Sequence, residues 1–258
     1  MIEIAFSPCP NDTFIFNDLA HQLDITAHLH DVDQLNRFAF TGRYDVTKLS
    51  FYAWLLLRET YQLLEVGAAL GRGCGPLLIT REAEPLPELP RVALPGELTT
   101  AHLLYRLCYG DRAEKVFMPF NQIMDALAAG EVDAGVIIHE GRFVFEERGF
   151  HCVQDLGVWW EAETGLPIPL GCIAVRRNLG KEVISDIEQR LKKSIELAFA
   201  HPEQTQEYVC AHAQELDSGV MEEHIKTYVN TFTQGLGKEG HAAVMELEKR
   251  ALAAGVIS

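Results

Sequence analysis

Short apolar segments alternate with amphipathic ones along the first half of the chain. Ile25–His30 places apolar and polar side chains on opposite faces with a period of two, which predicts a strand. Val32, Leu35 and Phe38 then recur at helical spacing, and Gly42 is a natural end for that helix. Further strands are predicted at positions 2–7, 46–50, 63–67 and 77–80. This alternation of strands and helices predicts a mostly parallel sheet covered by helices, and hence an α/β fold.

A proline-rich break separates this unit from a second unit with the same pattern. Prolines at 85, 87, 90 and 95 predict that Glu82–Pro95 is a linker. Beyond it, strands are predicted at 91–94, 115–118 and 134–139, with helices at 100–109 and 122–129. A second break, Thr164–Gly171, precedes the strand Cys172–Val175 and a helical C-terminal part.

The two breaks indicate that the chain leaves the first unit and later returns to it. The sequence therefore predicts a discontinuous first domain, residues 1–91 and 173–258, and an inserted α/β domain, residues 92–172. We expect a ligand in the cleft between the domains, at the carboxyl ends of the strands. Because only the two breaks join the units, we also expect a small shared core and rigid-body closure about these segments.

Composition narrows the class of protein. The 258 residues include 22 Lys+Arg and 37 Asp+Glu, a net charge of −15, which disfavours nucleic acid or an anionic membrane surface as a partner. The seven apolar residues Phe51–Leu57 are too few for a membrane helix. The first basic residue is Arg37, so no secretory signal is predicted and we expect a cytoplasmic protein. The six cysteines include no C-x-x-C pair, so free thiols are predicted and no metal site is.

Three segments combine polar groups with the carboxyl end of a predicted strand. Asn11 and Asp12 begin a helix, where free backbone N–H groups favour an anion or a sugar hydroxyl. Lys48 and Ser50 flank Leu49 and share one strand face, from which a lysine can pair with a substrate carboxylate.

The third segment is Thr99-Thr100, where two hydroxyls and two N–H groups can converge on a carboxylate at the start of a helix. Each of the three segments also has an ordinary structural explanation. Asn11, Asp12 and Thr99 are common capping residues, and a lysine at a strand end can extend to solvent.

His139 is the candidate general base. It closes the predicted strand Ala134–Ile138, so we expect it to face the crevice, and histidine is a common base near neutral pH. The alternative is a strand-end histidine whose hydrogen bonds are satisfied by backbone. Glu140 is expected on the opposite face, so the group that orients His139 is not identified. Cys9, between two prolines, is a poorly supported nucleophile.

Nine short segments occur in one order along the chain. They are Ser7–Phe16, Thr47–Ser50, Gly71–Pro76, Thr99–Ala101, Gly135–Glu140, Asp155–Gly157, Trp159-Trp160, Thr164–Pro167 and Tyr228–Asn230. In this combination the chain resembles the 1,4-dihydroxy-6-naphthoate synthases of the futalosine route to menaquinone. The resemblance covers nearly the whole chain.

The resemblance implies a type-2 periplasmic-binding-protein-like fold with a ligand cleft between two domains. It also implies a lyase that cleaves cyclic de-hypoxanthinyl futalosine to 1,4-dihydroxy-6-naphthoate and a small ribose-derived fragment, with no metal or other cofactor. His139 corresponds to the family's proton acceptor, and the segments Lys48–Ser50 and Thr99-Thr100 correspond to substrate contacts.

Two alternatives stay open at this point. One is chorismate dehydratase of the same pathway, and the other is a non-enzymatic small-anion binding protein of the same fold. The expected partner is a small-molecule substrate, with no nucleic acid and no membrane. The sequence does not indicate an oligomeric state.

Overall fold

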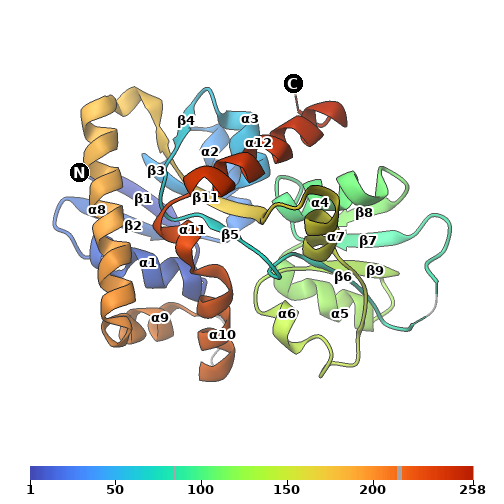
Figure 1. Ribbon diagram of the computed structural model, residues 1–258. Coiled ribbons are helices and arrows are strands. Elements are labelled where there is room, and N and C mark those ends of the chain that lie inside the picture. The colour runs from blue at the N-terminus through green and yellow to red at the C-terminus, as the bar shows by residue number, and fades with distance from the viewer. Residues whose placement is uncertain (84, 214–216, 258) are drawn as a thin grey trace.

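The computed structural model describes residues 1–83, 85–213 and 217–257, which form two lobes, each built on one sheet (Figure 1). The first sheet has six strands: β1 (Ile2–Phe6), β2 (Ile25–Leu29), β3 (Val46–Ser50), β4 (Tyr61–Leu63), β5 (Ala69–Gly71) and β11 (Ile168–Arg176). Its order is β2-β1-β3-β11-β4, and β5 also pairs with β11. β1 runs parallel to β2 and β3, whereas β11 is antiparallel to β3, β4 and β5, so this sheet is mixed.

The second sheet has five strands: β6 (Leu77–Thr80), β7 (Arg91–Leu94), β8 (Glu114–Phe117), β9 (Ala134–Ile137) and β10 (His151–Asp155). Its order is β10-β6-β9-β7-β8. β7 is parallel to β8 and β9, and β6 is antiparallel to β9 and β10. The sequence pattern did not predict β10, because this strand lies at the sheet edge and its first three residues are exposed.

Helices cover both sheets. They are α1 (Pro10–Ala20), α2 (Val32–Phe40), α3 (Phe51–Leu57), α4 (Thr100–Tyr109), α5 (Ile123–Ala128), α6 (Gly141–Val144), α7 (Leu156–Thr164), α8 (Lys181–Ala200), α9 (Gln206–His212), α10 (Ser218–Tyr228), α11 (Thr231–Gln234) and α12 (Gly237–Ala253). Every residue of β3 is buried because both of its faces are covered. Val46 packs in one core cluster with residues of α1 and α8, and Leu49 packs in another with residues of α3. Within the described ranges, no helix is both long enough and apolar enough to cross a membrane.

The chain enters the second lobe earlier than the sequence pattern predicts. The strand 77–80 was expected in the first unit, but it pairs with β9 and β10 of the second sheet. The described residues between β6 and β7, which are 81–83 and 85–90, therefore connect two strands of the same sheet and do not link the two units as predicted. The sequence of an apolar strand does not indicate which sheet it joins, because the strands that pair with it are distant in sequence. From the pairing we propose boundaries near residues 72–76 and 165–167 in place of 91/92 and 172/173.

The first crossover between the lobes is fixed by a close backbone contact. A Cβ atom at Gly75 would lie 2.2 Å from the backbone nitrogen of Gly157, so only glycine fits there. Arg142 donates to the Gly75 carbonyl at 2.6 Å and to Asp155 Oδ2 at 2.7 Å. Asp155 Oδ1 in turn accepts from Gly157 and Val158 and caps α7. The glycine-rich segment 71–76 thus serves the crossover.

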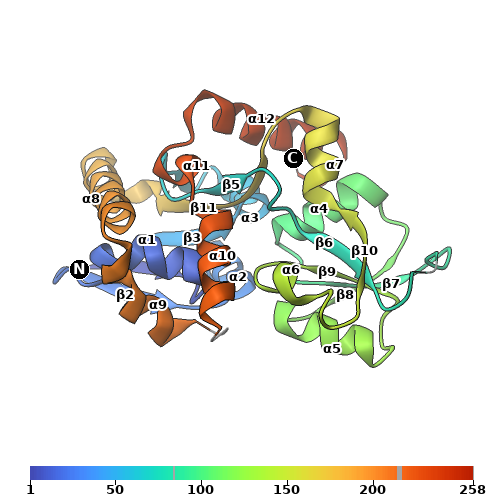
Figure 2. The same cartoon turned by 60° about the horizontal axis from the view of Figure 1, so that its bottom comes forward.

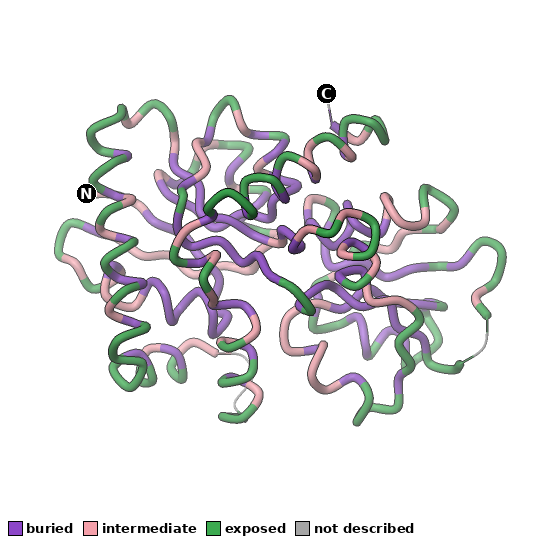
Figure 3. The backbone as a smooth tube through the Cα atoms, in the orientation of Figure 1, coloured by how far each residue is buried: buried purple, intermediate pink, exposed green. Residues whose placement is uncertain are grey.

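The two lobes share a continuous hydrophobic core, which contradicts the expected small one. One buried cluster joins Phe51 of the first lobe, Leu103 and Trp160 of the second, and Leu247 of α12. α12 begins over the first sheet and reaches α4 and α7 of the second lobe (Figure 2). The central strands of both sheets are largely buried, whereas most residues of the edge strands β2, β8 and β10 are not (Figure 3). Free rotation of one lobe about two crossovers would separate this core, so the packing of the described residues disfavours the predicted hinge.

We predict that α12 stabilises the whole fold through its inner face. Leu247→Ala removes a side chain that is 0% exposed, and it should lower the free energy of unfolding by about 2–5 kcal/mol. Leu252→Ala on the same helix is the matched control, because Leu252 is 45% exposed and its loss should cost less than about 0.5 kcal/mol. Urea denaturation followed by circular dichroism measures both. Equal effects of the two substitutions would contradict the shared core.

Candidate active site

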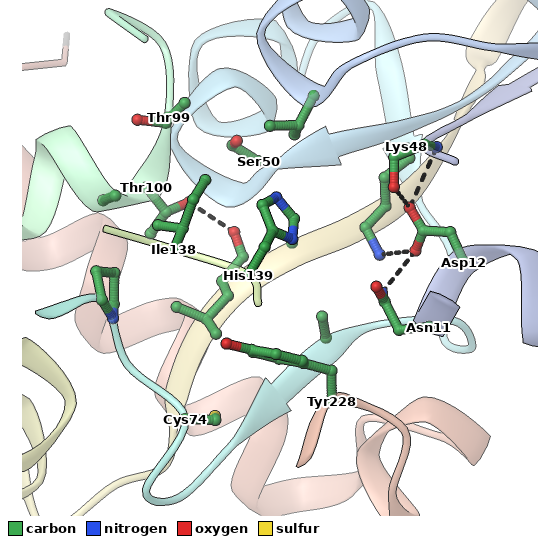
Figure 4. Close-up of a pocket in the computed structure, with 17 residues that line it drawn as sticks. Asn11, Asp12, Lys48, Ser50, Cys74, Thr99, Thr100, Ile138, His139 and Tyr228 are labelled. Atoms are coloured by element: carbon green, nitrogen blue, oxygen red, sulfur yellow. Dashed lines mark hydrogen bonds and ion pairs between the residues drawn. The ribbon is translucent and has the colours of Figure 1, made fainter. Parts of the chain in front are cut away.

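The carboxyl ends of four strands meet around one cavity between the lobes. The turn after β1, the end of β3, the segment between β7 and α4, and the segment after β9 contribute its walls, together with β11 and α10 (Figure 4). The cavity contains about 650 Å³ of empty space, part of it open to solvent. Its apolar wall includes Val32, Ala69, Ile138 and Leu170.

The structure brings seven of the eight predicted site residues to this cavity. They are Asn11, Asp12, Lys48, Ser50, Thr99, Thr100 and His139. Leu49 is the exception. Side chains alternate along β3, so Leu49 points away from its neighbours and packs in the hydrophobic core with Phe51.

Asp12 and Lys48 form a buried ion pair at the centre of one wall. Lys48 Nζ lies 2.7 Å from Asp12 Oδ1, and the two side chains are only 6% and 2% exposed. Asn11 Nδ2 donates to the same oxygen at 2.8 Å, and Ser7 Oγ donates to Asp12 Oδ2 at 2.6 Å. Lys48 was predicted to pair with a substrate carboxylate, but it already pairs with the carboxylate of Asp12. Its ammonium group therefore acts first as a structural cation.

Ser50 is held by a residue that the sequence did not single out. Asn36 of α2 is completely buried; its Nδ2 donates to Ser50 Oγ at 3.0 Å, and its Oδ1 accepts from Ser50 N at 2.9 Å. Asn36 Nδ2 also contacts the carbonyl of Leu98 at 3.4 Å, across the seam between the lobes. Asn36 thus fixes the end of β3 against the segment that leads into α4.

The hydroxyls of Thr99 and Thr100 are both used within the protein. Thr99 Oγ1 accepts from His102 N at 3.3 Å and caps α4, so Thr99 has the ordinary role of a capping residue. Thr100 Oγ1 donates to the carbonyl of Leu170 at 2.7 Å and accepts from Tyr52 N at 3.3 Å. Thr100 and Ala101 both line the cavity, and as residues of the first turn of α4 their backbone N–H groups have no acceptor inside the helix.

His139 lies beyond the strand that was expected to contain it. β9 ends at Ile137, and His139 has a φ of +55°, a left-handed conformation that is rare outside glycine. This turn brings the imidazole to the cavity wall, where its ring lies 4.9 Å from that of Phe120 and 5.8 Å from that of His224. In the part of the chain that the structure describes, the imidazole forms no hydrogen bond. The backbone and these two rings orient it.

His224 of α10 is a buried neighbour that sequence reasoning missed. Its ring is nearly parallel to that of His139, with 9° between the planes. Asn11 donates through Nδ2 to Asp12, so its Oδ1 accepts from His224 Nε2 at 2.9 Å and that nitrogen carries the proton. His224 Nδ1 is buried without a partner. Burial, then His139 and Lys48, hold the pKa of His224 well below its ordinary value, so its ring is neutral.

The cysteines near the cavity are not activated. Burial raises the pKa of the Cys74 thiol to about 12, and burial together with Glu140 raises the pKa of Cys9 well above its ordinary value. Both thiols therefore stay protonated, which argues against Cys9 as a nucleophile. Across the described residues, no three His, Cys, Asp or Glu side chains are grouped as metal ligands.

Tyr228 lines the cavity and was not predicted as part of the site. It is the last residue of α10. Its segment, Tyr228–Asn230, contributes to the family resemblance, but nothing in the local sequence places it beside His139, 89 positions earlier. Only the packing of α10 against the first lobe brings it there.

Known sequences are similar to this chain along nearly its whole length. A family model described as menaquinone biosynthesis matches residues 2–253. A 1,4-dihydroxy-6-naphthoate synthase of Streptomyces coelicolor is 44% identical over 268 residues, covering 99% of this chain and 94% of the relative. One from Thermus thermophilus is 45% identical over 260 residues, covering 99% and 95%.

Comparisons with solved structures confirm the expected periplasmic-binding-protein-like fold. A protein of Archaeoglobus fulgidus superposes with a TM-score of 0.94 at 36% identity, covering 99% of this chain and 98% of that one. The alkanesulfonate-binding protein of Xanthomonas axonopodis gives a TM-score of 0.71 at 13% identity, covering 100% and 94%, which establishes the fold alone. With the match over residues 2–253 and relatives at 44–45% identity, this chain belongs to the menaquinone-biosynthesis family.

Proposed function

We propose that this protein is a cytoplasmic lyase that cleaves cyclic de-hypoxanthinyl futalosine to 1,4-dihydroxy-6-naphthoate, with His139 as the general base. The observation that carries the proposal is an imidazole with no hydrogen bond to any described residue, on a cavity whose other polar side chains are mostly paired. A base needs a free nitrogen that can accept the substrate's proton. The names of the two relatives supply the product, 1,4-dihydroxy-6-naphthoate, and the family resemblance supplies the substrate.

The walls of the cavity suit an aromatic carboxylate. The apolar side chains of Val32, Ile138 and Leu170 can pack against a fused ring. The N–H groups of Thr100 and Ala101 at the start of α4 can bind a carboxylate, which the helix dipole favours. The carboxylate is assigned to this helix start because Lys48 already pairs with Asp12.

Cleavage of the retro-aldol type requires that a hydroxyl lose its proton as the carbon–carbon bond breaks. His139 accepts that proton in this proposal. Formation of an aromatic product favours the reaction, and a cavity largely lined by apolar groups limits the access of water to the reacting carbon.

The two alternatives are less well supported. The neighbours that bind solutes are related at only 12–13% identity and share the fold alone. Both close relatives carry the name of the naphthoate synthase and neither is named a chorismate dehydratase.

Incubation of the purified protein with cyclic de-hypoxanthinyl futalosine, and separately with chorismate, tests the proposal. We expect 1,4-dihydroxy-6-naphthoate from the first substrate and no change in the second, measured by liquid chromatography and mass spectrometry. Dehydration of chorismate, or binding of either compound without turnover, would contradict the proposed reaction.

His139→Asn should lower kcat/KM by about 10²–10⁴-fold, the usual contribution of a positioned base. Asparagine is the suitable replacement because it tolerates the left-handed backbone at φ +55°. Steady-state kinetics gives the loss, and an unchanged circular dichroism spectrum excludes unfolding. Turnover within about threefold of wild type would rule out this role.

The neutral state of His224 predicts a stability that falls in acid. An unfolded histidine protonates near pH 6.5, but buried His224 does not, so lowering the pH through 6.5 favours unfolding. Between pH 7.5 and 5.5 this histidine should account for a loss of about 1.4 kcal/mol in the free energy of unfolding.

His224→Gln keeps a donor toward Asn11 and removes the titration. Urea denaturation at both pH values should therefore show a smaller acid loss in the variant than in wild type. Burial also lowers the pKa values of His30 and His102, but both proteins contain them and their effects cancel. Identical pH dependence in the two proteins would show that His224 is protonated in the fold.

A further inference from the structure

Nearly every polar side chain on the cavity wall already has a partner within the protein. Asp12 binds Ser7, Asn11 and Lys48, and Ser50 is held by Asn36. The hydroxyls of Thr99 and Thr100 donate to backbone carbonyls. Among the described cavity residues, and leaving the Cys74 thiol aside, two polar side chains form no hydrogen bond: the imidazole of His139 and the hydroxyl of Tyr228.

The Tyr228 side chain extends into the cavity, with its hydroxyl at the free end (Figure 4). The residue as a whole is only 8% exposed. Its hydroxyl oxygen is nevertheless not fully buried, so this oxygen has access to the cavity space. Placing an unpaired phenol in a largely apolar cavity costs free energy unless a bound molecule accepts a hydrogen bond from its hydroxyl.

His224 connects the two free groups. Its ring stacks on that of His139, and its centroid lies 4.7 Å from that of Tyr228 with 53° between the planes. The hydrogen bond from His224 to Asn11 fixes this ring, and Asn11 is fixed by Asp12. His139 and Tyr228 therefore rest on the same buried support and face the same cavity.

The phenol keeps its proton at neutral pH and can therefore donate a hydrogen bond. Burial raises the pKa of Tyr228 well above its ordinary value, and nearby Cys74 adds to the effect. A phenolate, and with it a role as a second base, is therefore excluded near neutral pH. The imidazole and the phenol thus offer complementary chemistry, one acceptor and one donor.

We propose that Tyr228 is a second catalytic residue, which donates a hydrogen bond to the substrate oxygen that gains negative charge as the carbon–carbon bond breaks. This inference rests on the proposed function. His139 takes the proton from a substrate hydroxyl, whose C–O bond becomes C=O while the carbon–carbon bond breaks. The electron pair of that bond moves through the ring system onto the oxygen of a carbonyl group attached to the ring, and the C=O bond becomes C–O⁻. Tyr228 stabilises this oxygen without losing its proton, and the proton on His139 returns to neutralise the product.

Tyr228→Phe tests the hydroxyl alone, because the ring that contacts His224 is retained. A donor to a developing oxyanion is usually worth about 10²–10³-fold in kcat, and we expect a loss of this size with KM changed less than about threefold. Tyr105→Phe is the matched control, since Tyr105 is a buried tyrosine of α4 outside the cavity lining. It should keep wild-type kcat. A kcat within twofold of wild type for Tyr228→Phe would overturn the inference.

A second measurement needs no variant and covers the case in which Tyr228→Phe does not fold. The probe is 1-hydroxy-6-naphthoate, whose phenolic ionisation is followed by absorbance in the presence of saturating wild-type protein. A donor at the ring oxygen should move that ionisation of the bound probe to lower pH than in free solution. An unshifted or upward-shifted ionisation would overturn the inference.

The two experiments separate this inference from the proposed function. Wild-type protein that does not convert cyclic de-hypoxanthinyl futalosine contradicts the proposed function itself. Wild-type protein that converts it, with an equally active Tyr228→Phe, contradicts only the role of Tyr228.

Discussion

The buried ion pair between Asp12 and Lys48 is the interaction on which the cavity depends. It joins the first turn of α1, the helix that follows β1, to the neighbouring strand β3. A buried charge that loses its partner costs about 3–5 kcal/mol, so neither residue can be left alone in this position. Through Asn11 the same carboxylate also fixes His224, and through His224 it supports the rings of His139 and Tyr228.

Saturation of the other polar groups determines what the cavity offers a ligand. The serine and threonine hydroxyls that a motif would assign to substrate are engaged with backbone or with Asn36. Such groups cannot reorganise at low cost, so we expect the walls of the cavity to be rigid. The imidazole of His139 is held by contact with the rings of Phe120 and His224 and by a left-handed backbone, and it forms no hydrogen bond with any described residue.

The seam between the lobes is also more rigid than a two-hinge fold requires. Thr100 of the second lobe donates to Leu170 of the first sheet, and Asn36 of the first lobe contacts the Leu98 carbonyl of the second. On the far side, α12 packs against both lobes, and Arg250 of this helix lies over the ring of Trp160. Any motion that admits a ligand must preserve this core, so local displacement at the cavity mouth is favoured over rotation of a whole lobe.

The sequence by itself determined most of the element types, the two-unit α/β organisation and most of the cavity wall. Those features follow from local periodicity, and polar residues at the carboxyl ends of strands meet wherever such strands lie side by side. The period of two likewise separates Leu49 from Lys48 and Ser50, although all three were first assigned to the substrate.

Only the tertiary structure decided which sheet receives 77–80, that Lys48 is already paired, that Tyr228 of α10 reaches the cavity, and that His224 of the same helix packs against His139. Each of these depends on contacts between residues far apart in the chain. Hydrophobic periodicity contains no information about the partner of a strand or of a buried charge, because burial and pairing are properties of the packed whole.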